Sequence, residues 1–67
     1  MPTLGNLLRE ARIKAGLNQP QASKASGIAQ GNISEYEADK KAPNFAIVQR
    51  LAEAYKTTVS KLTRNLD

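Results

Sequence analysis

Apolar residues recur every three or four positions along most of this chain, which is the period of an α-helix. Between residues 4 and 15 the apolar positions form one inward stripe: Leu4, Leu7, Leu8, Ala11 and Ala15. A stripe of the same period follows between residues 45 and 55: Phe45, Val48, Leu51, Ala52 and Tyr55. A last apolar set lies near the end of the sequence: Val59, Leu62 and Leu66. The pattern predicts an all-α fold with five helices and no strands.

Residues that favour helix ends divide the chain between these stripes. Four side chains are placed to accept hydrogen bonds from the free amides of a first helical turn: Thr3, Asn18, Asn44 and Thr58. Pro20 suits the first turn of the second helix, where a missing amide hydrogen costs little. Gly16 ends the first helix, and Gly27 ends the second with a left-handed turn. The third helix is expected over residues 30–37, followed by an irregular connection over residues 38–43.

The segment from residue 19 to residue 37 places two short helices around a glycine turn. The first helix has small residues on one face, which lets another helix approach it closely: Ala22, Ser23 and Ser26. Ile28 in the turn is expected to fill the core, and Ile33 and Tyr36 give the second helix an inward face. Its outward face is polar: Gln30, Gly31, Ser34 and Glu35, with Asn32 at the margin. A face with amides rather than Lys/Glu pairs suits contact with hydrogen-bonding edges.

Composition excludes several classes of function. The 67 residues include neither cysteine nor histidine, which removes disulfides and the usual zinc or haem ligands, so we expect no metal and no cofactor. An active site would depend on serine, lysine, tyrosine and carboxylates on exposed helix faces, in a single domain too small for a water-excluding pocket. We therefore expect that the protein is not an enzyme. No apolar run approaches the roughly 20 residues that span a bilayer, and no signal peptide is apparent, which predicts a cytosolic protein.

The charge of the chain favours an anionic partner. Ten Lys and Arg residues against six Asp and Glu residues give a net charge of +4 and a pI near 9.8. The basic residues are spread along the sequence, so they do not form a disordered basic tail. A positive excess on a compact domain suits a polyanion such as nucleic acid. The charge is equally compatible with a role in solubility alone.

Five short motifs together resemble the Cro/CI-type (XRE-type) helix–turn–helix family of phage repressors. They are GLNQ at 16–19, the glycine at 27, NISEYE at 32–37, APNF at 42–45 and LAEAY at 51–55. The resemblance extends from about residue 4 to residue 62. It implies a five-helix, lambda-repressor-like domain over residues 1–67, with the helix–turn–helix at about 19–37. It also implies a bacterial or phage-encoded cytoplasmic regulator, a repressor of transcription that binds a double-stranded DNA operator as a homodimer.

Within this frame the third helix is expected to read bases in the major groove. The candidate base-reading residues are Gln30, Asn32, Ser34 and Glu35. A glutamine amide can bond both N6 and N7 of adenine, and a carboxylate can accept from N4 of cytosine. The family places its phosphate contacts at the start of the second helix and in the connection after the third. The candidates here are Arg12, Asn18, Gln19, Lys40, Lys41 and Asn44.

The resemblance also implies two structural roles. Arg12 and Glu37 are expected to form an ion pair that joins the first helix to the end of the third and fixes its angle. The dimer contact is expected near the last helix, with Thr57, Val59, Leu62 and Leu66 as candidates, although the apolar members of this set can equally belong to the core.

The sequence departs from the family at several positions. Ala22 and Ser23 stand where a large apolar residue and alanine are usual, which predicts a thin core at the second helix. Asp39 and Lys56 occupy helix-end positions where glycine is common, so each is expected in a left-handed conformation. Gly31 stands where many relatives carry a DNA-reading side chain.

Two other functions compete with DNA binding. A protein-binding helix–turn–helix module, such as an antitoxin or coactivator domain, is the main alternative, and exposed apolar residues on the third helix would favour it. Single-stranded RNA binding is disfavoured because Tyr36, Phe45 and Tyr55 all fall on predicted inward faces, which leaves no aromatic platform.

Overall fold

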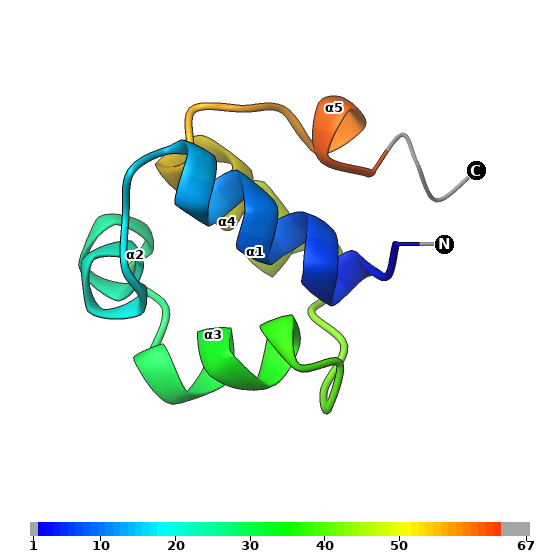
Figure 1. Cartoon of the computed structure of the whole chain (residues 1–67), viewed down its shortest axis with the longest axis horizontal. Helices are drawn as coiled ribbons and strands as arrows, with labels where there is room; N and C mark the ends of the chain where they lie inside the picture. Colours follow the sequence, from blue (N-terminus) through cyan, green and yellow to red (C-terminus); the bar gives the residue numbers. More distant parts are fainter. Residues whose placement is uncertain (1, 64–67) are drawn as a thin grey trace.

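The computed structural model describes residues 2–63, and these residues form five α-helices (Figure 1). The helices are α1 (Leu4–Lys14), α2 (Gln19–Ser26), α3 (Gln30–Glu37), α4 (Phe45–Ala54) and α5 (Val59–Thr63). The described range contains no strand. The predicted all-α class and the predicted number of helices are therefore confirmed.

In Figure 1, α1 lies in the middle of the view with α4 behind it. α3 runs along one side and packs against α1 and α2, while α2 also packs against α4. α5 contacts α1 and α4 on the opposite side from α3. This arrangement leaves one long face of α3 without any other described helix over it.

Side chains cap four of the five helix starts, at the four residues that the sequence predicts. The hydroxyl of Thr3 accepts from the amide of Asn6 at 3.1 Å, and the hydroxyl of Thr58 accepts from the amide of Lys61 at 3.1 Å. Asn18 and Asn44 cap α2 and α4 in the same way, at 2.8 and 2.9 Å. The side chain of Gln21 also accepts from the amide of Asn18 at 2.9 Å, which completes a capping box.

Four helices end in a left-handed residue, among them α2 at Gly27 with φ of 76°. After the other three, an amide bonds back to a carbonyl five residues earlier. Gly16 takes this position after α1 with φ of 78°, Asp39 after α3 with φ of 58°, and Lys56 after α4 with φ of 56°. The closing hydrogen bonds run from Leu17 to Arg12, from Lys40 to Glu35 and from Thr57 to Ala52. The left-handed conformations expected at Asp39 and Lys56 are therefore confirmed.

The core consists of eleven buried apolar residues: Leu7, Leu8, Ala22, Ile28, Ile33, Tyr36, Val48, Leu51, Ala52, Tyr55 and Leu62. Ala22 is fully buried, so α2 approaches its neighbours closely. Two serines tie the turn after α2 to the helix. The hydroxyl of Ser23 donates to the carbonyl of Ile28 at 2.6 Å, and the hydroxyl of Ser26 accepts from the amide of Ile28 at 3.2 Å. These bonds hold Ile28 in the core between α2 and α3.

Two residues of the predicted inward stripes lie on the surface. Phe45 is 68% exposed, so its predicted inward position is wrong. It is the first residue of α4 and lies between exposed neighbours, and the buried stripe begins one turn later at Val48. Ala15 is exposed because α1 ends at Lys14 and the chain turns away there. Leu17, which was expected in the core, is half-buried.

No helix within residues 2–63 has the length and apolar character needed to span a membrane. The same range contains no cluster of three or more side chains suited to hold a metal ion.

Tyr55 carries the one buried side-chain polar atom within residues 2–63 that lacks a hydrogen-bond partner. Burial of the hydroxyl, with the carboxylate of Glu37 nearby, raises the pKa of Tyr55 to about 12. The folded state therefore holds the phenol proton more tightly than the unfolded state, and this contribution to stability is lost as pH rises from about 10 through 12.

The substitution Tyr55→Phe is expected to leave the free energy of unfolding unchanged at pH 7 or to raise it by up to about 1 kcal/mol, because it removes an unpaired buried hydroxyl. Relative to the parent protein, the variant is also expected to lose less stability between pH 9 and 11, since it has no phenol to ionise. Urea denaturation at the two pH values measures both effects. A loss of more than 1 kcal/mol at pH 7 would show that the hydroxyl has a stabilising partner.

Candidate nucleic-acid interface

The outer face of α3 is polar and accessible. Gln30, Gly31, Ser34 and Glu35 are exposed, and Asn32 is half-buried at the edge of the face. Ile33, Tyr36 and Glu37 are buried on the opposite face and attach α3 to the rest of the molecule. The four candidate base-reading residues thus come together on one helix, and Figure 1 shows no other helix over its outer side.

A buried ion pair fixes the end of α3. Nε and Nη2 of Arg12 donate to the two carboxylate oxygens of Glu37 at 2.7 and 3.0 Å. Both side chains are buried, with exposed fractions of 11% and 5%. Nη1 of Arg12 also donates to the carbonyl of Leu17 at 3.0 Å. The hydrogen bonds to Glu37 raise the pKa of Arg12 above its usual value, so the guanidinium stays charged.

The start of α2 joins the same network. Nε2 of Gln19 donates to a carboxylate oxygen of Glu37 at 3.1 Å, so Glu37 connects α1, α2 and α3. Gln19 keeps one further N–H and its carbonyl oxygen for another partner. The capping bond of Asn18 occupies its side-chain oxygen and leaves its NH₂ group available. Because helix N-termini attract anions, these two amides lie where a phosphate would be favoured.

Arg12 itself has a different position from the one expected for a phosphate contact. It is 9% exposed, and its guanidinium is already bonded to Glu37 and Leu17. These bonds join α1 to the end of α3 and to the connection before α2, so the main role of Arg12 is to orient these helices.

The connection after α3 carries the other candidate phosphate contacts. Nζ of Lys41 donates to the side-chain oxygen of Asn32 at 2.9 Å and lies 5.8 Å from the centre of the Tyr36 ring. Lys40 is exposed, and Asn44 caps α4. Lys41 is thus held beside the outer face of α3, whereas the exposed Lys40 can turn towards a sugar–phosphate backbone. Since Lys41 only donates, the bonded atom of Asn32 must be its oxygen, which leaves the NH₂ group free.

Asp39 forms a contact that the sequence did not predict. Its carboxylate accepts from the hydroxyl of Thr3 at 2.6 Å and from the amide of Gly5 at 3.1 Å. The acidic side chain therefore binds the N-terminal turn of α1, where the free amides favour negative charge. This contact gives Asp39 a role that glycine at the same left-handed position does not have. The two partners Thr3 and Asp39 lie 36 residues apart, so local sequence patterns do not reveal their contact. The one local signal is that Thr3 is recognisable as a cap residue.

The candidate dimer residues divide into two groups. Leu62 is 5% exposed and packs in the core. Thr57 and Val59 are half-buried, so part of each side chain remains on the surface. Leu66 lies outside the described residues.

Comparison with known proteins identifies the family. A family model described as helix-turn-helix matches residues 8–62. The chain is 35% identical over 60 residues to the HTH-type transcriptional regulator ImmR of Bacillus subtilis (strain 168). That alignment covers 90% of this chain and 47% of the relative, so the chain spans about half the length of ImmR. The chain therefore belongs to the XRE-type helix–turn–helix family of DNA-binding transcription regulators.

Proposed function

We propose that the protein binds double-stranded DNA sequence-specifically, with α3 in the major groove. The observation that carries this proposal is the outer face of α3, which presents amides and a hydroxyl while the buried Arg12–Glu37 pair fixes its inner side. Base contacts specify sequence, whereas phosphate contacts set register and orientation. Gln30, Asn32, Ser34 and Glu35 are assigned the first role. Asn18, Gln19, Lys40 and Lys41 are assigned the second, with Asn44 beside them.

The active form is proposed to be a homodimer on an operator with two half-sites. One domain of this size makes few base contacts, and two domains placed a helical turn apart roughly double the binding free energy. Thr57 and Val59 are proposed to lie at the subunit contact because part of each side chain remains exposed. The similarity to a relative named as a transcriptional regulator supports a role in transcription, here repression in the bacterial cytoplasm.

The alternative of a protein-binding module finds less support on α3. No large apolar residue lies among its exposed positions, and the exposed large apolar residues within the described range are Ile13 on α1 and Phe45 at the start of α4. Phe45 also leaves one aromatic ring exposed, but single-stranded RNA modules stack two or three bases on several such rings.

The substitution Gln30→Ala tests the proposal. Gln30 is exposed at the N-terminal end of α3, so the fold loses no core contact. Specific affinity is expected to fall by about 1–3 kcal/mol per half-site, with relaxed discrimination at one base pair in each half. Selection of bound sites from random duplex DNA, followed by titration of the selected and a scrambled duplex, measures both quantities.

Non-specific affinity is the internal control in this experiment, because no phosphate contact is removed. An equal loss on every duplex would make Gln30 a backbone contact and transfer base reading to Asn32, Ser34 and Glu35. Unchanged binding to all duplexes would favour the protein-binding alternative.

Replacement of both Lys40 and Lys41 by alanine tests the phosphate contacts. Affinity for all duplexes is expected to fall, and the slope of log K against log salt is expected to decrease by about 2 per bound subunit. The matched control is the replacement of Lys14 and Lys61, which removes the same charge from α1 and α5 at positions outside α3 and the connection after it. If both double variants change the slope equally, only net charge matters and the connection after α3 does not face DNA.

A further inference from the structure

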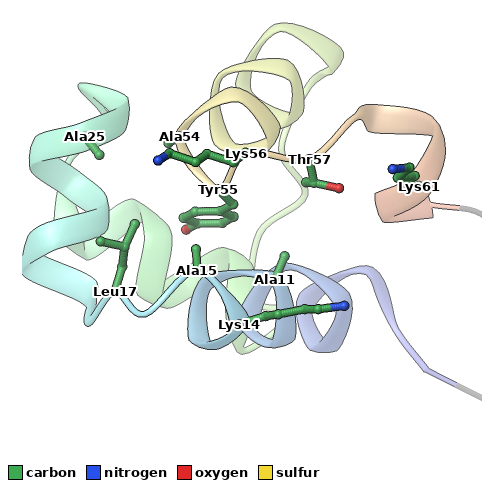
Figure 2. A pocket seen from close by; sticks show the side chains of 10 residues that line it. All are labelled: Ala11, Lys14, Ala15, Leu17, Ala25, Ala54, Tyr55, Lys56, Thr57 and Lys61. Carbon is green, nitrogen blue, oxygen red and sulfur yellow. The ribbon is translucent and has the colours of Figure 1, made fainter.

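A groove lies between the ends of α1 and α2 and the connection from α4 to α5 (Figure 2). Its volume is about 740 Å³, and ligand-binding clefts commonly have volumes of about 300–1,000 Å³. The apolar part of its surface includes Leu17, Ala25, Ala54 and the ring of Tyr55. None of the residues that line it belongs to α3, so the groove is separate from the candidate nucleic-acid interface.

Three lysines surround this groove: Lys14 at the end of α1, Lys56 after α4 and Lys61 in α5. All three are exposed, and no carboxylate lines the groove. The single ion pair within residues 2–63 joins Arg12 and Glu37, so none of the three lysines has an acidic partner in the described range. The groove thus combines an apolar floor with an uncompensated positive rim.

The lysines do not converge on one point. In Figure 2 the amino groups of Lys14 and Lys61 lie on one side of the groove, and the amino group of Lys56 lies on the other. A small anion requires its donors to meet around a single position, as they do in a bidentate pocket. Separated charges around an apolar floor instead match a longer partner with acidic groups at its edges and apolar groups between them.

The hydroxyl of Tyr55 is not accessible from the groove. It is buried and has no hydrogen-bond partner, while the ring of the same residue forms part of the groove lining. Figure 2 shows the hydroxyl end of the ring turned towards the side of Leu17. An occupant of the groove therefore contacts the ring of Tyr55 and not its hydroxyl.

We propose that this groove docks an acidic amphipathic segment of a partner protein. Its apolar face covers Leu17, Ala54 and Tyr55, and its acidic edges meet the three lysines. A second copy of this chain is a poorer occupant of the groove, since it brings a net charge of +4 against a positive rim. The subunit contact proposed above, at Thr57 and Val59, shares only Thr57 with the groove lining. The inference does not depend on DNA binding, because it concerns a different face.

The test is a titration of ¹⁵N-labelled protein with a designed amphipathic peptide of about 15 residues, with leucine on one face and glutamate at the edges. Saturable shifts of the backbone amides are expected at Lys14, Ala54, Thr57 and Lys61, with little change along α3. A peptide with the same leucines and with lysine in place of each glutamate is the matched probe and is expected to bind at least about tenfold more weakly.

Variants separate the groove from general attraction to a basic protein. The double substitution Lys14→Glu and Lys61→Glu is expected to lower the affinity for the acidic peptide by about tenfold or more. The single control Lys24→Glu alters an exposed lysine of α2 outside the groove and is expected to change the affinity less than about twofold. All three sites are exposed, so the variants retain the fold.

Several results would overturn the proposal. These are an absence of shifts at millimolar peptide, equal affinity for the lysine-bearing peptide, an equal effect of Lys24→Glu, or shifts centred on α3. Shifts of the Lys14 and Ala54 amides, which lie outside the proposed subunit contact, would assign the groove to a second copy if they depended on protein concentration without peptide. Failure of any duplex to bind leaves this test unaffected, so the two proposals can fail separately.

Discussion

Replacement of Glu37 by alanine is expected to lower the free energy of unfolding by about 3–5 kcal/mol, because it leaves the guanidinium of Arg12 buried without its counter-ion. Arg12 is 9% exposed and loses both bonds to the carboxylate, while Gln19 loses its bond at the start of α2. A chain of this size has a total stability of roughly 3–10 kcal/mol. The variant is therefore expected to be largely unfolded at 37 °C, which urea denaturation monitored by circular dichroism measures.

The control for this prediction removes both charges together. The double variant Arg12→Leu and Glu37→Leu is expected to lose less stability than Glu37→Ala alone, because apolar side chains fill the site without an unpaired ion. The thermodynamic cycle with Arg12→Ala, Glu37→Ala and the double alanine variant gives the coupling energy. Strictly additive losses would mean that the two side chains do not interact in solution.

The pair also has a consequence for recognition. Glu37 links the last turn of α3 to α1 and to the first residue of α2, so it sets the angle between the two helices of the motif. In conditions where the Arg12→Ala variant remains folded, we expect its loss of specific DNA affinity to exceed the effect of one removed charge. The pair therefore combines stability with the orientation of the base-reading face.

The elements were predictable because their signals are local. The caps Thr3, Asn18, Asn44 and Thr58 act on amides three residues away, and the glycine turns depend on a single backbone angle. The inward positions of Ile33 and Tyr36 follow from a period of 3.6 residues within one short helix. The structure reproduces all of these features with helix boundaries within one or two residues of those predicted.

Other features depend on how distant segments pack together, and the periodicity of the sequence carries no information about that packing. Phe45 continues the stripe of α4 in register, yet its exposure depends on where the neighbouring helices end. The bond between Lys41 and Asn32 joins a connection to a helix face. The groove beside Tyr55 combines residues from α1, α2, α4 and α5. The base-reading assignment followed from family resemblance, and it remains a proposal about contacts with DNA.

Gly5 lies where α1 and the end of α3 approach each other closely. A side-chain carbon at this position would lie 2.6 Å from the carbonyl oxygen of Tyr36 and 2.7 Å from that of Glu37. It would also lie 2.8 Å from the carboxylate of Asp39, which accepts from the amide of Gly5. Two of these three atoms belong to the backbone, so a flexible side chain cannot relieve the overlap. The absence of a side chain at Gly5 thus allows the last turn of α3 to rest on the first turn of α1.

The substitution Gly5→Ala is accordingly expected to destabilise the fold by about 2–3 kcal/mol, since α1 must separate from the end of α3 and the contact with Asp39 is lost. Urea denaturation at pH 7 measures the loss. Gly31→Ala is the matched control, because it makes the same chemical change within a helix where no atom lies within 4 Å of the added carbon. At Gly31 the higher helix propensity of alanine is expected to raise the free energy of unfolding by as much as about 1 kcal/mol. Equal effects of the two substitutions would show that α1 and α3 are not in backbone contact at Gly5, and the packing that orients α3 would have to be assigned elsewhere.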